Sequence, residues 1–193
     1  MVTPVGILLA AGRGARFDPT GASDKLLAPY GPGGTVVGAS ARHLLAAVPH
    51  VIAVVAPGAD AVARELEAAG CTVTVCPEAA QGMGASLVHA VRKSLPAPLG
   101  WVIALGDMPD VLPSTIEALC DAIADGAGIA APAMHGRRGN PVAFGPGQRD
   151  ALLALGGDEG ARGLLASQDV TLVEVPDAGI FRDIDTPGDL RAV

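Results

Sequence analysis

Short apolar runs alternate with longer amphipathic stretches along the whole chain. The runs have the length of strands, and in order they are Val5–Ala11, Val51–Ala56, Thr72–Val75, Trp101–Leu105, Ile129–Ala133, Pro141–Phe144 and Val170–Val175. The remaining stretches predict helices over Val36–Val48, Ala59–Ala69, Gly84–Leu95, Pro113–Asp125, Gln148–Leu155, Glu159–Ser167 and Pro187–Val193. Strands that alternate with helices predict an α/β fold with a doubly wound, mostly parallel sheet.

The composition adds how the core of this sheet is built. The 193 residues fit a single domain that covers 1–193. Half of the residues are hydrophobic but only 3% are aromatic, so the core consists of Ala, Val, Leu and Ile. Such a core suits parallel strands that are covered by helices on both faces. Ligands of these sheets bind beyond the carboxyl ends of the strands, and the residues just after each strand are therefore the candidates for a site.

The charge balance narrows the class of ligand. The net charge is −7 and the pI is near 4.9. Nucleic acids and anionic membranes attract proteins with a basic face, so we expect neither as a partner. The longest stretch without Asp, Glu, Lys or Arg runs from His43 to Ala59, which is shorter than the ~20 apolar residues of a membrane span. Val5–Ala11 lacks the basic flank of a signal peptide, and we expect a cytoplasmic protein.

The cysteines and histidines show no pattern of a metal site or of a nucleophile. Cys71, Cys76 and Cys120 are odd in number and contain no C-x-x-C pair, so we expect reduced thiols without a disulfide framework or zinc. The four histidines have no metal-ligand spacing and belong to no Ser-His-Asp or Cys-His arrangement. We interpret them as structural or surface residues.

The loop after the first apolar run has a pattern typical of phosphate binding. Gly12–Arg16 reads GRGAR, and no Gly-Lys-Ser/Thr follows that would make it a Walker A loop. Phe17 stands where a dinucleotide-binding loop has its third glycine, which disfavours that reading. Backbone N–H groups of a glycine loop and arginine side chains bind phosphate oxygens well, and Lys25 adds a compact charge. The alternative is a glycine turn with solvated basic residues.

Six blocks in order along the chain resemble one enzyme family. They are LAAGRGARF…DKLLAPYG, QGMGASL at 81–87, ALGDMPDV at 104–111, GRRGNPVAF at 136–144, GDEGARGLL at 157–165 and DIDTPGDL at 183–190. Together they are similar to the signature of the MobA/MocA-like nucleotidyltransferases, the molybdenum cofactor guanylyl- and cytidylyltransferases. Gly14 and Phe17 depart from the usual Ser and Met, and the gap from Arg16 to Lys25 is longer than usual.

This resemblance implies a Rossmann-like fold of the nucleotide-diphospho-sugar transferase type and a set of site residues. It implies Mg²⁺ held by Asp107 and Asp185, and catalytic roles for Arg16, Lys25 and Asp107. The nucleotide-binding residues that it implies are Leu9, Ala10, Ala11, Gly12, Arg13, Gly14, Gln81, Gly82 and Ser86, and the acceptor-binding residues are Arg138, Asn140 and Arg162. Structural alternatives stand beside these roles. Asp107, Asp185 and Ser86 are also placed to cap helices, and the residues near 138 also suit a solvated hairpin.

The resemblance also implies which nucleotide is used. Members that use CTP tend to read Leu-Ala-Ala-Gly after the first strand, and those that use GTP read Leu-Ala-Gly-Gly. The chain reads Leu9-Ala10-Ala11-Gly12. A Cβ at Ala11 narrows the space beside the base, which favours a pyrimidine. We therefore expect transfer of CMP from CTP to a phosphorylated acceptor, molybdopterin above all, with release of pyrophosphate.

Three alternatives stay open at this stage. A guanylyltransferase or a sugar-phosphate nucleotidyltransferase would have the same fold. A nicotinamide-dependent oxidoreductase would also begin with a glycine loop after its first strand, although Asp107 and the missing third glycine speak against it. A catalytically silent nucleotide-binding regulator would keep the motifs without turnover. For a cofactor-forming enzyme, the expected protein partner is a molybdoenzyme or its chaperone.

Overall fold

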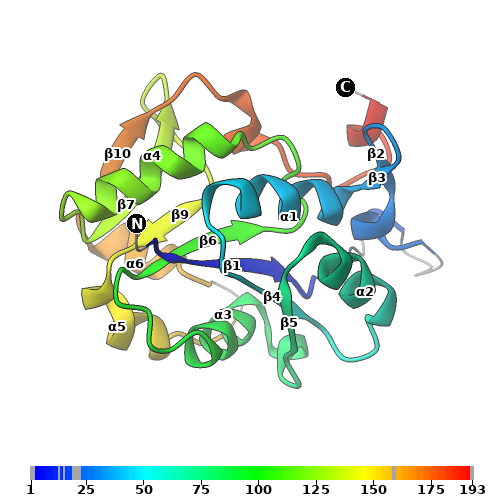
Figure 1. Ribbon diagram of the computed structural model, residues 1–193, viewed down its shortest axis with the longest axis horizontal. Coiled ribbons are helices and arrows are strands. Elements are labelled where there is room, and N and C mark those ends of the chain that lie inside the picture. The colour runs from blue at the N-terminus through cyan, green and yellow to red at the C-terminus, as the bar shows by residue number, and fades with distance from the viewer. Residues whose placement is uncertain (1–2, 13, 15, 19–22, 158–159, 192–193) are drawn as a thin grey trace.

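A mostly parallel sheet runs through the centre of the molecule (Figure 1). The computed structural model describes residues 3–12, 14, 16–18, 23–157 and 160–191. Within them, eight strands form the sheet in the order β10-β7-β9-β6-β1-β4-β5, with β8 paired to β7. Their bounds are β1 Val5–Ala10, β4 Val51–Val55, β5 Thr72–Val75, β6 Trp101–Leu105, β7 Ile129–Met134, β8 Arg137–Arg138, β9 Val142–Phe144 and β10 Thr171–Glu174. A separate hairpin consists of β2 (Pro29–Tyr30) and β3 (Gly34–Thr35).

The strand pairing confirms the predicted sheet. β1 is parallel to β4 and β6, β4 is parallel to β5, and β7 is parallel to β10. β9 is the exception, since it runs antiparallel to both β6 and β7. The connection explains this difference. Only a short segment with β8 joins β7 to β9, whereas a parallel pair needs a crossover of about a dozen residues or more.

Helices cover both faces of the sheet (Figure 1). One face carries α1 (Val36–Ala47), α2 (Asp60–Ala69) and α4 (Pro113–Ala124), and the other carries α3 (Met83–Lys93), α5 (Arg149–Leu153) and α6 (Arg162–Ser167). Two hydrophobic cores result, one on each face, as expected for parallel strands with two covered faces. Among the described residues, no helix is both long and apolar enough to cross a membrane.

The central strand β1 supplies side chains to both cores. Leu8 packs on the side of α1 and α4 with Leu44, while its neighbour Ile7 packs on the side of α3 with Leu87 and Trp101. Successive side chains of a strand point to opposite faces, so a run without polar residues fits a strand that is buried on both. The apolar run VGILLA therefore places β1 in the middle of the molecule.

The structure differs from the predicted elements mainly where they are short. The hairpin β2–β3 and four 3₁₀ turns were not predicted, because two to four residues are too few to show a hydrophobic period. The turns are η1 Lys25–Leu27, η2 Ala79–Gln81, η3 Pro146–Gln148 and η4 Ala178–Phe181. The predicted helix Pro187–Val193 is wrong over its described part, which contains only the 3₁₀ turn η5 at Asp189–Arg191. The predicted helix start at Glu159 lies outside the described residues.

The order of the strands creates the opening for a site. After β1 the chain moves outward through β4 and β5, then returns to β6 on the other side of β1. The chain therefore leaves β1 toward β4 and leaves β6 toward β7, in opposite directions along the sheet. A cleft is expected at such a switch point.

Candidate active site

A cleft of about 600 Å³ lies at the carboxyl ends of β1 and β6. Its walls contain most of the residues that the sequence singled out, namely Leu9, Ala10, Ala11, Gly12, Gly14, Arg16, Lys25, Gly82, Ser86, Asp107, Arg162 and Asp185. Arg13 lies outside the described residues. The cleft is large enough for a nucleotide-sized ligand.

Lys25 joins the two aspartates at the floor of this cleft. Its Nζ lies 2.7 Å from Oδ2 of Asp107 and 3.0 Å from Oδ1 of Asp185. The side chain of Lys25 is 9% exposed, and the two carboxylates are 22% and 23% exposed. Burial by itself lowers the pKa of Lys25, but the hydrogen bonds and charges of Asp107 and Asp185 outweigh burial and raise the pKa above its usual value. The amine therefore carries a full positive charge between the two carboxylates.

Arg16 approaches the same pair from the solvent side. Its Nη1 lies 2.8 Å from Oδ2 of Asp185, and its side chain is 80% exposed. Ion pairs this exposed contribute little to stability and exchange readily. Arg16 is thus free to leave Asp185 for a bound anion.

Other aspartates bond the chain beside these two residues. Asp177, not Asp107, holds the start of α4, because it accepts hydrogen bonds from the backbone N–H of the N-cap residue Leu112 (2.9 Å) and from Oγ1 of Thr115 (2.6 Å). Asp189 accepts a hydrogen bond from the backbone N–H of Asp185 at 3.1 Å. The side chains of Asp107 and Asp185 are therefore used within the cleft and not as helix caps.

A second cluster of polar side chains connects the same segments as Lys25, Asp107 and Asp185. The hydroxyl of Tyr30 donates a hydrogen bond to Oδ1 of Asp110, and Nη1 of Arg182 lies 2.9 Å from Oδ2 of the same carboxylate. Burial and the bond to Asp110 raise the pKa of Tyr30 to about 12. The three residues lie on the same three segments as Lys25, Asp107 and Asp185, so the cluster fastens these segments together.

Sequence reasoning missed Tyr30 and Arg182 in this role. Tyr30 lies inside the block DKLLAPYG and Arg182 directly precedes DIDTPGDL, but neither has a spacing that marks it. A backbone hydrogen bond from Ile184 to the carbonyl of Asp107 (2.8 Å) completes the link between the two acidic segments.

The opposite wall of the cleft is formed by η2 and the start of α3. Gly82 has φ +119°, a conformation that favours glycine, and it directly precedes α3. Ser86 lies in that helix, is buried, and lines the cleft; the N-cap is Gly82, so Ser86 does not cap the helix. Gln81 is exposed and is not among the residues that line the cleft. Ala79, Ala80 and Met83 line it without having been predicted.

The residues predicted to bind the acceptor are not brought together. Arg162, at the start of α6, lines the cleft. Arg138 lies outside it on β8 and donates a hydrogen bond to the carbonyl of Leu165 at 3.2 Å. Asn140 lies between β8 and β9, where its backbone N–H bonds the carbonyl of Ile180 at 3.0 Å. For these two residues the alternative of a surface hairpin fits the structure.

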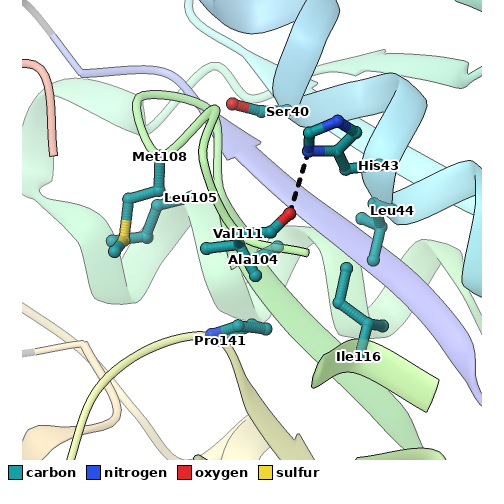
Figure 2. A pocket seen from close by; sticks show the side chains of 9 residues that line it. All are labelled: Ser40, His43, Leu44, Ala104, Leu105, Met108, Val111, Ile116 and Pro141. Atoms are coloured by element: carbon teal, nitrogen blue, oxygen red, sulfur yellow. Dashed lines mark hydrogen bonds between the residues drawn. The ribbon is translucent and has the colours of Figure 1, made fainter. Parts of the chain in front are cut away.

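A second cavity lies between α1 and the loop after β6 (Figure 2). Its volume is about 10 Å³, room for about one water molecule. Ser40 donates a hydrogen bond to the carbonyl of Gly106 at 3.0 Å, and Nδ1 of His43 lies 2.9 Å from the carbonyl of Val111. The cavity is too small for a substrate. Its polar contacts instead attach α1 to the loop that carries Asp107.

Comparisons with known proteins agree on one family. The family model described as the MobA-like NTP transferase domain matches residues 6–172. The crystal structure of Rv0371c from Mycobacterium tuberculosis H37Rv is similar over 99% of this chain and 97% of its own, with 30% identity and a TM-score of 0.84. A complex of Rv0371c with manganese covers 99% and 100% at 29% identity and a TM-score of 0.79.

A nucleotidyl transferase from Methanothermobacter thermautotroptrophicus is similar over 97% of this chain and 94% of its own, with 25% identity and a TM-score of 0.81. A comparison with curated protein sequences gives no match.

Proposed function

Because this chain belongs to the MobA-like NTP transferase family, we propose that it transfers CMP from CTP to a phosphorylated pterin such as molybdopterin. Nucleotidyl transfer as such follows from the family. The observation that carries the proposal is the meeting of Asp107, Asp185, Lys25 and Arg16 in one cleft at the carboxyl ends of β1 and β6.

The two aspartates fit a divalent cation such as Mg²⁺. Mg²⁺ and Mn²⁺ prefer oxygen ligands and are commonly held by one or two carboxylates together with substrate phosphates. In this structure the ammonium of Lys25 already lies between one oxygen of Asp107 and one of Asp185. The pair therefore offers the charge and spacing that a cation needs. When bound, a divalent cation would supply neutralisation of the triphosphate charge.

Lys25 and Arg16 are the groups that take the phosphates. Both are cations bound to carboxylates of the site, and a divalent cation on those carboxylates would release them. The stem of Lys25 packs against Gly14, where a Cβ would lie 3.3 Å from Cγ of the lysine. Its ammonium is thereby held next to the glycine loop, whose backbone suits phosphate oxygens. Because its ammonium lies beside this loop, Lys25 can exchange an aspartate partner for a phosphate.

The reaction needs positioning and charge compensation more than covalent help from the protein. An oxygen of the acceptor phosphate forms a bond to the α-phosphorus of CTP, the bond from that phosphorus to the bridging oxygen breaks, and pyrophosphate leaves. The developing charge lies on the nonbridging and leaving oxygens. Lys25 and Arg16 are placed to stabilise it, and such contacts contribute about 10²–10³-fold each to rate.

The base and the acceptor would occupy opposite parts of the cleft. Ala11 lines it directly after β1, and its Cβ favours a pyrimidine over a purine. Gly82 and Ser86 line the wall that would face the base and ribose. Arg162 is the acceptor-binding candidate that the fold brings to the cleft. Arg138 and Asn140 remain proposals for an acceptor that extends beyond it.

Pyrophosphate release tests the proposal. We expect Mg²⁺-dependent release with CTP and molybdopterin, less with GTP, and a loss of about 100-fold or more in Asp107→Asn. Asp121→Asn, an exposed aspartate on α4, serves as the matched control and should keep full activity. A preference for GTP would overturn the choice of base. Release with sugar phosphates only would overturn the choice of acceptor. No pyrophosphate release with any acceptor would favour the catalytically silent regulator.

A further inference from the structure

Three side chains with metal-binding atoms meet beside the cleft, outside the site described above. They are Cys76, Glu78 and His89, whose thiol sulfur, carboxylate oxygen and ring nitrogen all lie within 4.8 Å of one another. Cys76 directly follows β5, Glu78 directly precedes η2, and His89 lies in α3. The sequence carried no C-x-x-C or close Cys-His spacing here, so only the fold reveals this cluster.

We propose that Cys76, Glu78 and His89 form a second metal site, selective for a soft divalent transition metal of the Zn²⁺ class. Thiolate and imidazole ligands favour Zn²⁺, whereas Mg²⁺ prefers oxygen alone. The carboxylate pair Asp107 and Asp185 contains only oxygen donors, so the two sites differ in the metal they select. Three protein ligands leave one tetrahedral position for water.

The surroundings hold the cluster in place. Cys76 is fully buried, and its backbone N–H bonds the carbonyl of Val55 on β4 at 3.0 Å. Thr74 Oγ1 lies 2.8 Å from Nε2 of His89, a contact that fixes the imidazole plane, as outer-shell partners of metal-bound histidines do. Sγ of Cys76 lies 4.0 Å from Oε2 of Glu78. Since Glu78 is exposed, a metal ion can enter from solvent on that side.

The position of the cluster links it to the wall of the cleft. Glu78 is followed immediately by Ala79 and Ala80, which line the cleft, and His89 shares α3 with the cleft residue Ser86. A metal held by Glu78 and His89 would tie η2 to α3 and so stiffen this wall. Metal binding itself does not depend on the proposed transferase activity.

Cobalt absorption provides a direct test on the full-length protein. Co²⁺ binds zinc sites, and a charge-transfer band in the near ultraviolet appears only when a thiolate is a ligand. With excess Mg²⁺ present, we expect one equivalent of Co²⁺ to give this band, and Zn²⁺ to abolish it by displacement. Asp107→Asn should keep the band, which separates this site from the oxygen-ligated one.

Variants assign the ligands. Cys76→Ser should lose the band, while Cys120→Ser, which removes another free thiol, should keep it. His89→Gln and the exposed Glu78→Gln should weaken Co²⁺ binding by about tenfold or more, in line with the effect of lost ligand-shell groups. The Glu78 variant also guards against misfolding, because its side chain is at the surface. No band in the wild type, or a band that survives in Cys76→Ser, would overturn the proposal.

Discussion

At the scale of single residues, Lys25 joins the two acidic segments of the site. It is almost buried and bonds both Asp107 and Asp185, so it offsets the repulsion between two neighbouring carboxylates. An ammonium in this position mimics the charge of a metal ion. The same residue thus stabilises the carboxylate pair and, in the proposed reaction, would exchange to a phosphate.

The chain offers a matched pair for testing this double role, since Lys25 and Lys93 are its only lysines. Lys25→Ala should lower the free energy of unfolding by about 2 kcal/mol, the value of hydrogen bonds to charged groups. Mg²⁺ should restore part of the lost stability, because the metal would replace the ammonium between the carboxylates. Urea unfolding with and without Mg²⁺ measures both. Lys93 is exposed, so Lys93→Ala should keep a free energy of unfolding within about 0.5 kcal/mol of the wild type. A loss of stability as large as that of Lys25→Ala would refute the role assigned to Lys25.

Tyr30 supports a prediction about alkaline pH. Its pKa is raised from 10.0 to about 12, first by burial and then by the bond to Asp110. Above its unfolded-state pKa the unfolded chain releases this proton while the folded protein retains it, so stability falls from about pH 10 to about pH 12. Tyr30→Phe should show a smaller fall over that range. Denaturant unfolding at successive pH values compares the wild type with Tyr30→Phe. If stability falls equally steeply with pH in both proteins, the role of Tyr30 is contradicted.

At the scale of elements, the long periodic segments were predictable and the short ones were not. Thr72–Val75 and Trp101–Leu105 are strands with the predicted bounds, and α1, α2 and α4 differ from prediction by one residue at an end. Their apolar periods are set by burial against the sheet. The predicted helices over 148–155 and 159–167 shorten to α5 and α6, because loop contacts compete with helix ends where few apolar side chains pack.

The start of α4 is held by a residue that sequence reading could not locate. Pro113 signals the helix start, but the carboxylate that bonds Leu112 and Thr115 there comes from Asp177, far along the chain. Asp177 is 3% exposed and also accepts a hydrogen bond from the N–H of Gly179. Asp177→Ala should lower the free energy of unfolding by about 2–3 kcal/mol, because it leaves buried hydrogen-bond donors without a partner. Thermal and urea unfolding measure the loss. Asp121→Ala, on the exposed face of the same helix, should change the free energy of unfolding little. A loss comparable to that of Asp177→Ala would indicate helix propensity as the cause instead.

At the scale of the whole molecule, the cleft depends on segments that are far apart in sequence. Asp107 follows β6, Lys25 follows β1, and Asp185 arrives from the end of the chain after β10. The Tyr30–Asp110–Arg182 cluster fastens the same three segments. The site is therefore a property of the closed fold and not of any one motif.

The fold also separates two arginines that the motifs treated alike. Arg162 lines the cleft, whereas Arg138 lies outside it and bonds a backbone carbonyl. Arg162→Ala should raise the KM for the phosphorylated acceptor by about tenfold, as expected for a lost charge-assisted contact. Arg138→Ala should change that KM by no more than about twofold. This is well below the tenfold change that corresponds to about 1.4 kcal/mol of binding energy. Steady-state pyrophosphate release at varied acceptor concentration distinguishes them, and the reverse ranking would place the acceptor at the hairpin.

The sequence alone determined the α/β class and the edge of the sheet where a site is expected, and its resemblance to the MobA-like family gave Lys25, Asp107 and Asp185 as candidates. The class could be predicted because hydrophobic period is a local property of the chain, and the candidates because the motifs occur in the family's order. Only the tertiary structure decided that Lys25 joins the two aspartates, that Asp177 bonds the start of a distant helix, and that Cys76, Glu78 and His89 meet. These contacts depend on strand order and on how loops pack, and neither leaves a periodic trace in the sequence.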